Sequence, residues 1–71
     1  MKREKVHSSS LAAVGYDMVT KTLEVEFNHG GIYQYLDVPF QRYEELMTAA
    51  SMGRYFDKYI RDAGFPYLKV E

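Results

Sequence analysis

The chain has 71 residues, nine of them basic and ten acidic, and a formal net charge of −1. This length makes one domain and leaves no room for a second, and the balanced charge argues against strong non-specific binding to nucleic acid. The absence of cysteine excludes disulfides and a thiol nucleophile, and no apolar run has the length needed to cross a membrane. We therefore expect one cytoplasmic domain over residues 1–71, with no membrane partner.

The N-terminal residues 1–7 are mostly polar and lead into three serines. We expect them to be disordered, as polar chain ends often are. Residues 8–16 follow as a first strand, in which Gly15 indicates a bulge or a close backbone approach. Asp17 opens a turn, where its carboxylate is placed to accept a hydrogen bond from the backbone two residues on.

The segment 22–28 is the clearest strand of the sequence. Leu23, Val25 and Phe27 alternate with polar residues, which is typical of a strand with one buried face. After Gly30-Gly31 a further strand carries Tyr33 and Tyr35, and their spacing places both tyrosines on one face of a sheet.

The loop length between these strands decides where the two tyrosines point. A two-residue loop, His29-Gly30, would place them opposite Glu26 and Glu24 on the solvent-exposed face of the sheet. A three-residue loop, 29–31, would place Tyr33 opposite Phe27 and Tyr35 opposite Val25, toward the core. We favour the three-residue loop because Gly30-Gly31 supplies the glycine that such loops need, although a slip by one residue reverses the answer.

Two helices follow the strands. Pro39 is suited to the first position of a helix, and an apolar stripe with helical spacing runs to Ala50. Ser51-Met52-Gly53 interrupts this helix and begins a second one, which Gly64 ends. Residues 67–70 form a short C-terminal edge strand or an ordered tail. The order of elements predicts an α+β fold, namely a three-stranded antiparallel β-meander followed by two short helices packed on one face.

The opening of the second helix is the first candidate binding site. Free backbone N–H groups, the Ser51 hydroxyl and Arg54 would converge beside Gly53, which is an arrangement that holds anions. Lys58 and Arg61 would follow along the same side of the helix, because residues three and four apart are neighbours. The alternative is that Ser51 is an ordinary N-cap and that the basic residues form a solvated face.

The tyrosines are the second candidate site. Tyr33 and Tyr35, or Tyr55 on the second helix, would offer rings on which nucleic-acid bases stack. The alternative is that Tyr33 and Tyr35 belong to the core and keep their hydroxyls at its rim.

Nothing in the sequence indicates catalysis, a metal or another cofactor. His7 and His29 lie far apart and have no partner at ligand spacing. No acid, base or nucleophile is paired with another. We expect a protein that is not an enzyme.

The motifs of the chain resemble the KTSC domain, whose name comes from the C-terminal domain of certain lysyl-tRNA synthetases. The resemblance covers about residues 8–65 and rests on the following pattern: Tyr16-Asp17, Leu23-x-Val25-x-Phe27, Gly31-x-Tyr33-x-Tyr35, Val38-Pro39, Tyr43, Ala50-Ser51-x-Gly53, Phe56 and Ile60-Arg61. It implies a bacterial or phage source and a link to RNA. It assigns no catalytic residue.

Two hypotheses for function follow. The first is a non-catalytic RNA-binding accessory module, with tRNA or a single strand as partner. The second is a protein–protein interaction module or a small homo-oligomer that binds no nucleic acid.

Overall fold

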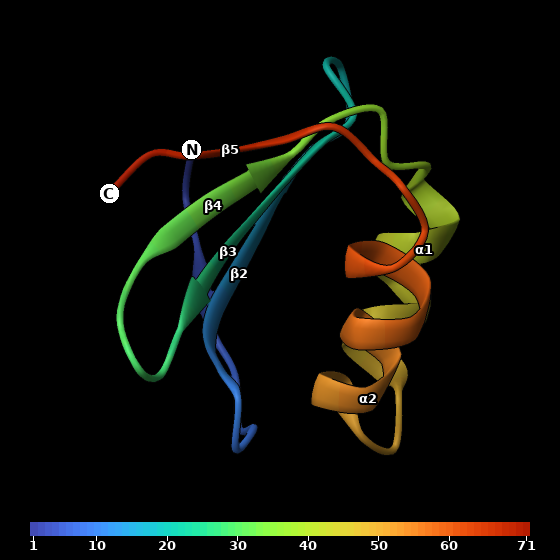
Figure 1. Ribbon diagram of the computed structural model, residues 1–71. Coiled ribbons are helices and arrows are strands. Elements are labelled where there is room, and N and C mark those ends of the chain that lie inside the picture. The colour runs from blue at the N-terminus through green and yellow to red at the C-terminus, as the bar shows by residue number, and fades with distance from the viewer.

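The computed structural model describes all residues, 1–71, and shows one antiparallel sheet with two helices on one face (Figure 1). The strand order is β1-β2-β3-β4-β5. The strands are β1 (Glu4–Lys5), β2 (Leu11–Asp17), β3 (Thr22–Phe27), β4 (Ile32–Tyr35) and β5 (Tyr67–Lys69). The helices are α1 (Phe40–Thr48) and α2 (Met52–Phe56), and a π-helical turn, η1 (Asp57–Arg61), continues α2. None of the helices has the length and apolar character of a membrane span.

The α+β class is confirmed, but the prediction of a three-stranded sheet is wrong. The sheet has five strands, of which the first four form a meander. Glu4 and Lys5 pair with Val14 and Ala13, within the segment expected to be disordered. The fifth strand, β5, returns after the helices and pairs with β4. This position of β5 confirms the edge-strand alternative for residues 67–70. Strand β1 has only two residues and depends on pairing with a distant segment, so local alternation in the sequence gives little sign of it.

Strand β2 has a close backbone approach at Gly15, one of the two alternatives that the sequence offered, whereas its bulge lies nearer the start of the strand. The pairing with β3 shifts between Leu11 and Ala13, which marks a β-bulge and lets Leu11 and Val14 both enter the core. At Gly15 itself, a Cβ atom would lie 2.6 Å from the backbone oxygen of Lys2. Glycine is therefore required for the N-terminal segment to lie against β2.

The turn that leads from β2 to β3 agrees with the sequence. The Asp17 carboxylate accepts a hydrogen bond from the backbone N–H of Val19, with a nitrogen–oxygen distance of 2.8 Å.

The β3–β4 hairpin corrects the predicted register. Tyr33 lies opposite Val25, not Phe27, and Tyr35 lies opposite Leu23, not Val25. The loop does have three residues, but they are 28–30. The Phe27 N–H donates to the Gly31 oxygen, and the Gly30 N–H donates back to the Phe27 oxygen. Moving both ends of the loop by one residue shifts the register by two, so both tyrosines keep the face shared with Val25.

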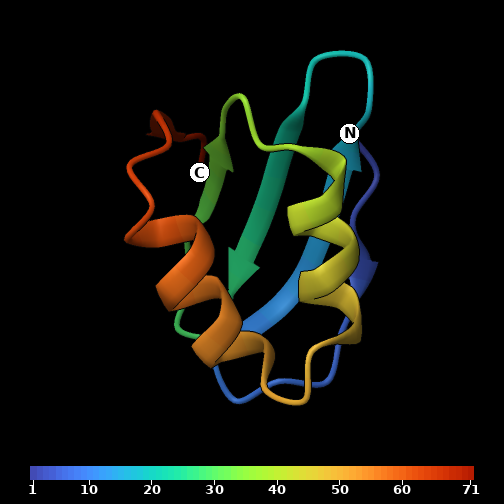
Figure 2. The same cartoon turned by 90° about the vertical axis from the view of Figure 1, so that its right-hand side faces the viewer.

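The core lies between this face of the sheet and the two helices (Figure 2). Leu46 of α1, Phe56 of α2 and Ile60 of η1 are completely buried against the sheet. The strands contribute Leu11, Val14, Leu23, Val25 and Tyr35, and Val38 joins them from the loop before α1. The central part of the sheet is thereby covered, while its β4–β5 side remains open beside η1.

Glu24 on the opposite face of the sheet is also buried, with 5% of its surface exposed. Arg3, just before β1, donates from Nη1 to its Oε2 at 2.6 Å, and Gln34 of β4 donates from Nε2 to its Oε1 at 2.8 Å. Burial alone would raise the pKa of Glu24. The hydrogen bonds from Gln34 and Arg3, with the charge of Arg3, outweigh this effect and leave the pKa below its ordinary value.

We expect the Glu24→Gln variant to lose stability at neutral pH but to approach the wild type in acid. A depressed pKa in the folded state means that the carboxylate stabilises the fold above its unfolded pKa, about 4.3, and that this contribution disappears as the pH falls through the lower folded pKa. Urea unfolding at several pH values between neutrality and strong acid measures the difference in free energy of unfolding. A difference that stays constant with pH would show that the ionised Glu24 contributes nothing.

Candidate functional site

An open aromatic cleft of about 340 Å³ lies where η1 faces the β4–β5 side of the sheet. Seven residues line it: Phe27, His29, Tyr33, Tyr35, Phe56, Arg61 and Tyr67. We call this feature the aromatic cleft. It brings together three residues that the sequence had placed in two separate candidate sites, namely Tyr33, Tyr35 and Arg61.

The floor of the aromatic cleft is built from buried rings. Phe56 is 1% exposed and Tyr35 is 4% exposed. Their ring centroids lie 5.3 Å apart in an edge-to-face arrangement, and Phe27 meets Phe56 edge-to-face at 5.4 Å. Because these contacts belong to the core, the floor is held rigidly.

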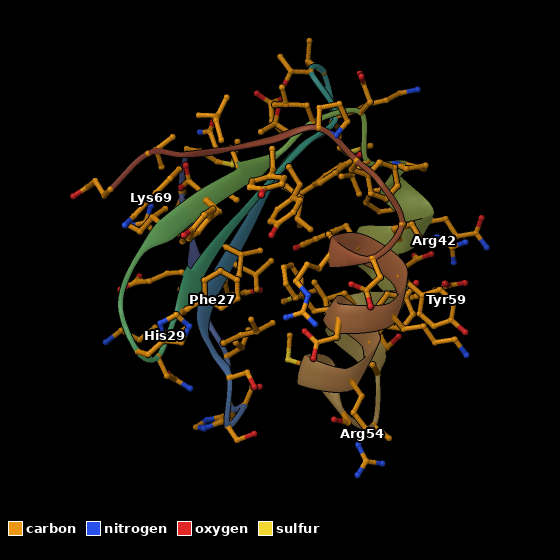
Figure 3. All side chains as sticks on the ribbon, viewed as in Figure 1. Phe27, His29, Arg42, Arg54, Tyr59 and Lys69 are labelled. Atoms are coloured by element: carbon orange, nitrogen blue, oxygen red, sulfur yellow. The ribbon has the colours of Figure 1, made fainter.

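The walls of the aromatic cleft are more accessible. Tyr67 of β5 is 63% exposed, and its ring stacks on Tyr35 with centroids 5.4 Å apart. On the other side, the imidazole of His29 stacks almost parallel on Phe27 at 5.4 Å. Figure 3 shows Phe27 and His29 together near the β3–β4 turn. Accessible ring faces of this kind can bind a further flat group by stacking.

Arg61 gives the aromatic cleft its positive charge. Its side chain is 57% exposed, and its guanidinium pairs loosely with Asp57 at 3.4 Å and with Asp62 at 3.5 Å. A guanidinium has five N–H donors, so donors remain for a ligand. A second cation, Lys69, lies directly opposite Tyr33 in the sheet.

The hydroxyl of Tyr35 is the polar group on the floor. Burial is the main cause that raises the pKa of this phenol, followed by the charge interaction with Tyr67, whereas Arg61 acts in the opposite direction. The phenol is therefore protonated at neutral pH and able to donate a hydrogen bond.

The structure places Ser51, Gly53 and Arg54 at the far end of α2, away from the aromatic cleft. The Ser51 hydroxyl accepts a hydrogen bond from the Arg54 backbone N–H at 3.4 Å, as an N-cap does. A Cβ atom on Gly53 would lie 3.0 Å from the Ser10 hydroxyl, so this glycine allows α2 to approach the sheet. The Arg54 side chain extends beyond the helix end (Figure 3).

Tyr55 and Lys58 belong to a different cluster, which joins α2 and η1 to α1. The Tyr55 hydroxyl donates to the Glu45 carboxylate of α1. Arg42 and Lys58 lie over the ring of Tyr59, at 5.0 and 5.2 Å from its centroid. Figure 3 shows Arg42 and Tyr59 on the outer side of the helices. We call it the helix-pair cluster, because it ties α1 to α2.

The π-helical turn explains why Lys58 and Arg61 do not share one side of the helix. Within η1 the Asp62 N–H bonds to the Asp57 oxygen, five residues back. This wider turn changes the angular spacing of the side chains that an α-helix would give. Lys58 consequently faces the helix-pair cluster, whereas Arg61 lines the aromatic cleft.

Sequence reasoning did not assign Phe27, His29 or Tyr67 to the binding site. Tyr67 was missed because β5 joins the sheet only after two helices, so nothing in the local pattern places it beside Tyr35. No three His, Asp or Glu side chains lie close enough together to hold a metal ion.

Fold and cleft together define a small α+β domain that presents aromatic rings and an arginine on one open surface. The family model of the KTSC domain matches residues 7–65. The chain belongs to the KTSC domain family, as its motifs indicated.

Individual relatives agree with this assignment. An uncharacterized protein of Stutzerimonas stutzeri is 38% identical over the full length of both chains. The crystal structure of a KTSC domain protein from Yersinia pestis matches with a TM-score of 0.93 and 38% identity, over 99% of this chain and 97% of that one. A lysine–tRNA ligase of Nostoc sp. is 44% identical over 57 residues, which are 80% of this chain but only 10% of the ligase.

Proposed function

We propose that the protein is a non-catalytic RNA-binding module and that the aromatic cleft is its RNA-binding surface. The observation that carries this proposal is the position of Arg61 beside the exposed rings of His29 and Tyr67. Stacking of bases on rings and pairing of phosphate with a cation are the main interactions by which proteins bind single-stranded nucleic acid of any sequence. We assign no chemical step to the site.

The similarity to part of a lysine–tRNA ligase supports an RNA partner, because the name of that enzyme links it to tRNA. The similarity covers a tenth of the ligase, so it says nothing of aminoacylation by this chain.

The charge of the chain sets the expected strength of binding. A net charge of −1 provides no broad attraction for phosphate. Only Arg61 and Lys69 act near the rings, and both Asp57 and Asp62 partly neutralise Arg61. We therefore expect a Kd of about 1–100 µM at physiological salt, within the range of weak, phosphate-driven binding.

The Arg61→Ala variant should bind RNA at least about tenfold more weakly than the wild type, because a charged hydrogen bond to phosphate is lost. The matched control is Arg54→Ala, which removes the same charge from the same helical segment but outside the aromatic cleft. Fluorescence anisotropy with tRNA and with a short single strand, over a series of salt concentrations, measures both effects. The plot of log K against log salt concentration should become shallower by about 0.7 in Arg61→Ala, because one phosphate contact is lost, and should keep its slope in Arg54→Ala.

Two results would contradict the proposal. One is the absence of binding by the wild type at low salt, where phosphate contacts are strongest. The other is equal weakening by Arg54→Ala and Arg61→Ala, which would indicate a diffuse charge effect instead of a site.

A second candidate function is association with a protein or with another copy of the chain, through β5. Tyr67, Leu68 and Val70 are exposed on this edge of the sheet, at 63%, 43% and 39%. An exposed edge strand can pair with a strand of a partner, although the cation Lys69 on the same strand disfavours such pairing. Light scattering over a range of concentrations distinguishes the two: self-association through β5 predicts a rise in mass with concentration, and the RNA proposal predicts none.

A further inference from the structure

The Tyr35 hydroxyl is a polar group without a partner at the bottom of the aromatic cleft. The residue is 96% buried, since 4% of its surface is exposed, and its ring packs edge-to-face on Phe56. No hydrogen bond within the chain engages its hydroxyl, whereas the hydroxyls of Tyr16 and Tyr55 are both bonded. No side-chain oxygen or nitrogen that is sealed from solvent lacks a partner, so the Tyr35 hydroxyl opens into the cleft.

The lining of the cleft places this hydroxyl more closely. Tyr33, Tyr67 and Arg61 line the same cleft as Tyr35, and the ring of Tyr67 stacks on that of Tyr35. The hydroxyl that opens into this cleft therefore shares its space with the rings and the arginine. A ligand that fills this space meets ring faces at its sides, a donor at its end and a guanidinium beside it.

The aromatic cleft continues into a second, polar hollow. Phe27, His29 and Arg61 line both spaces. The second hollow, of about 440 Å³, is otherwise lined by Ser9, Ser10, Asn28 and Asp57. The two together form a groove that is aromatic at one end and polar at the other, with Arg61 at the junction. An extended chain can lie along such a groove.

We infer that the aromatic cleft holds one unpaired nucleotide of a single-stranded RNA, with its base edge hydrogen-bonded to the Tyr35 hydroxyl and its phosphate paired with Arg61. This inference rests on the proposed function and specifies its ligand. The backbone on one side of that nucleotide follows the polar hollow. The phosphate pairs with the guanidinium donors of Arg61 that Asp57 and Asp62 leave free.

Base-paired RNA does not fit this arrangement. In a duplex the faces of a base are covered by its neighbours, and its polar edge is engaged by the opposite strand. The A-form major groove is too deep and narrow for side chains to read, so proteins that recognise individual RNA bases bind them in loops, bulges and ends. The walls of the aromatic cleft can enclose a base only when it is turned out of such a stack.

The Tyr35→Phe variant tests the inference, because it removes the hydroxyl and keeps the ring that the core needs. The probe is a labelled RNA single strand of about twelve nucleotides, with uridine, cytidine and adenosine versions, compared with the same strand annealed to its complement. The wild type should bind the single strand at least about tenfold more tightly than the duplex, since only the single strand offers a free base. Tyr35→Phe should weaken single-strand binding about three- to tenfold, the loss of one hydrogen bond, and should leave duplex binding unchanged.

The control is Tyr16→Phe. This variant also removes one hydroxyl, but that hydroxyl is bonded to the Val38 carbonyl outside the cleft. It should leave the Kd for the single strand unchanged. Thermal unfolding shows whether either variant alters the fold.

The outcomes separate this inference from the proposed function. If RNA binds through Arg61 but single strand and duplex bind equally, and Tyr35→Phe has no effect, the inference is overturned and phosphate binding remains. If no form of the RNA binds at low salt, both fail. If Tyr35→Phe weakens single strand and duplex alike, the hydroxyl contacts the backbone and the assignment of the base edge is wrong.

Discussion

Replacing Phe56 by alanine is expected to lower the free energy of unfolding by about 3–5 kcal/mol, the usual cost of removing a buried aromatic side chain. Phe56 is 1% exposed and joins Phe27 and Tyr35 of the sheet to α2. A small domain is stable by only about 5 kcal/mol or slightly more, so the variant should be largely unfolded near 37 °C. Circular dichroism during heating and urea titration measures the loss.

The control for this prediction is Phe40→Ala. Phe40 lies at the start of α1 and is 41% exposed. Its loss should cost at most about 1 kcal/mol, as for most surface substitutions. Similar unfolding curves for the two variants would mean that the aromatic floor contributes no more to stability than a surface ring.

Replacing Tyr67 by alanine is expected to weaken RNA binding by about 1–3 kcal/mol, the cost of losing one base–aromatic stack. This corresponds to a rise of about five- to 150-fold in Kd. Tyr67 is 63% exposed, so the fold should survive its removal. Anisotropy titration with the single strand at low salt gives the change in Kd, and a circular dichroism spectrum shows whether the sheet is retained.

Tyr59→Ala provides a stringent control for Tyr67→Ala. Tyr59 has two cations, Arg42 and Lys58, over its ring, so the helix-pair cluster is another place where a ring and positive charge coincide. We expect this variant to bind RNA as the wild type does. If Tyr59→Ala weakens binding and Tyr67→Ala does not, the binding surface lies on the outer side of the helices.

The face of the Tyr33–Tyr35 pair was predictable from the sequence, but its neighbours were not. Alternation placed both tyrosines on one face, and glycine in the loop favoured the length that turns this face to the core. The position of the loop was wrong by one residue, because Gly30 and Gly31 both have positive φ, 103° and 92°, and either could have completed the turn. A register shift of two residues leaves both tyrosines on the same face of the sheet, but it changes the residue that lies opposite each of them.

The candidate site was only partly accessible to sequence reasoning, because long-range contacts build it. Tyr67 contacts Tyr35 because β5 pairs with β4. This pairing depends on how the two helices between these strands direct the chain back to the sheet. Arg61 was recognised as a binding residue, but helical spacing grouped it with Arg54 and Lys58. No local motif predicts the π-helical turn, and this turn directs Arg61 to the aromatic rings instead.

Ser51 and Gly53 illustrate the opposite case. Both are part of the family pattern, and a serine, a glycine and an arginine at a helix start are typical of anion sites. The structure accounts for Ser51 as an N-cap and for Gly53 as a contact with Ser10. A motif can thus reflect the packing of a helix on a sheet.

An NMR chemical-shift map of the protein titrated with the single-stranded RNA at low salt shows which surface binds the RNA. We expect the largest changes in the aromatic cleft, at Phe27, Tyr33, Arg61 and Tyr67, and no changes in the helix-pair cluster. Changes concentrated at Ser51 and Arg54, or no changes at any RNA concentration, would contradict this expectation.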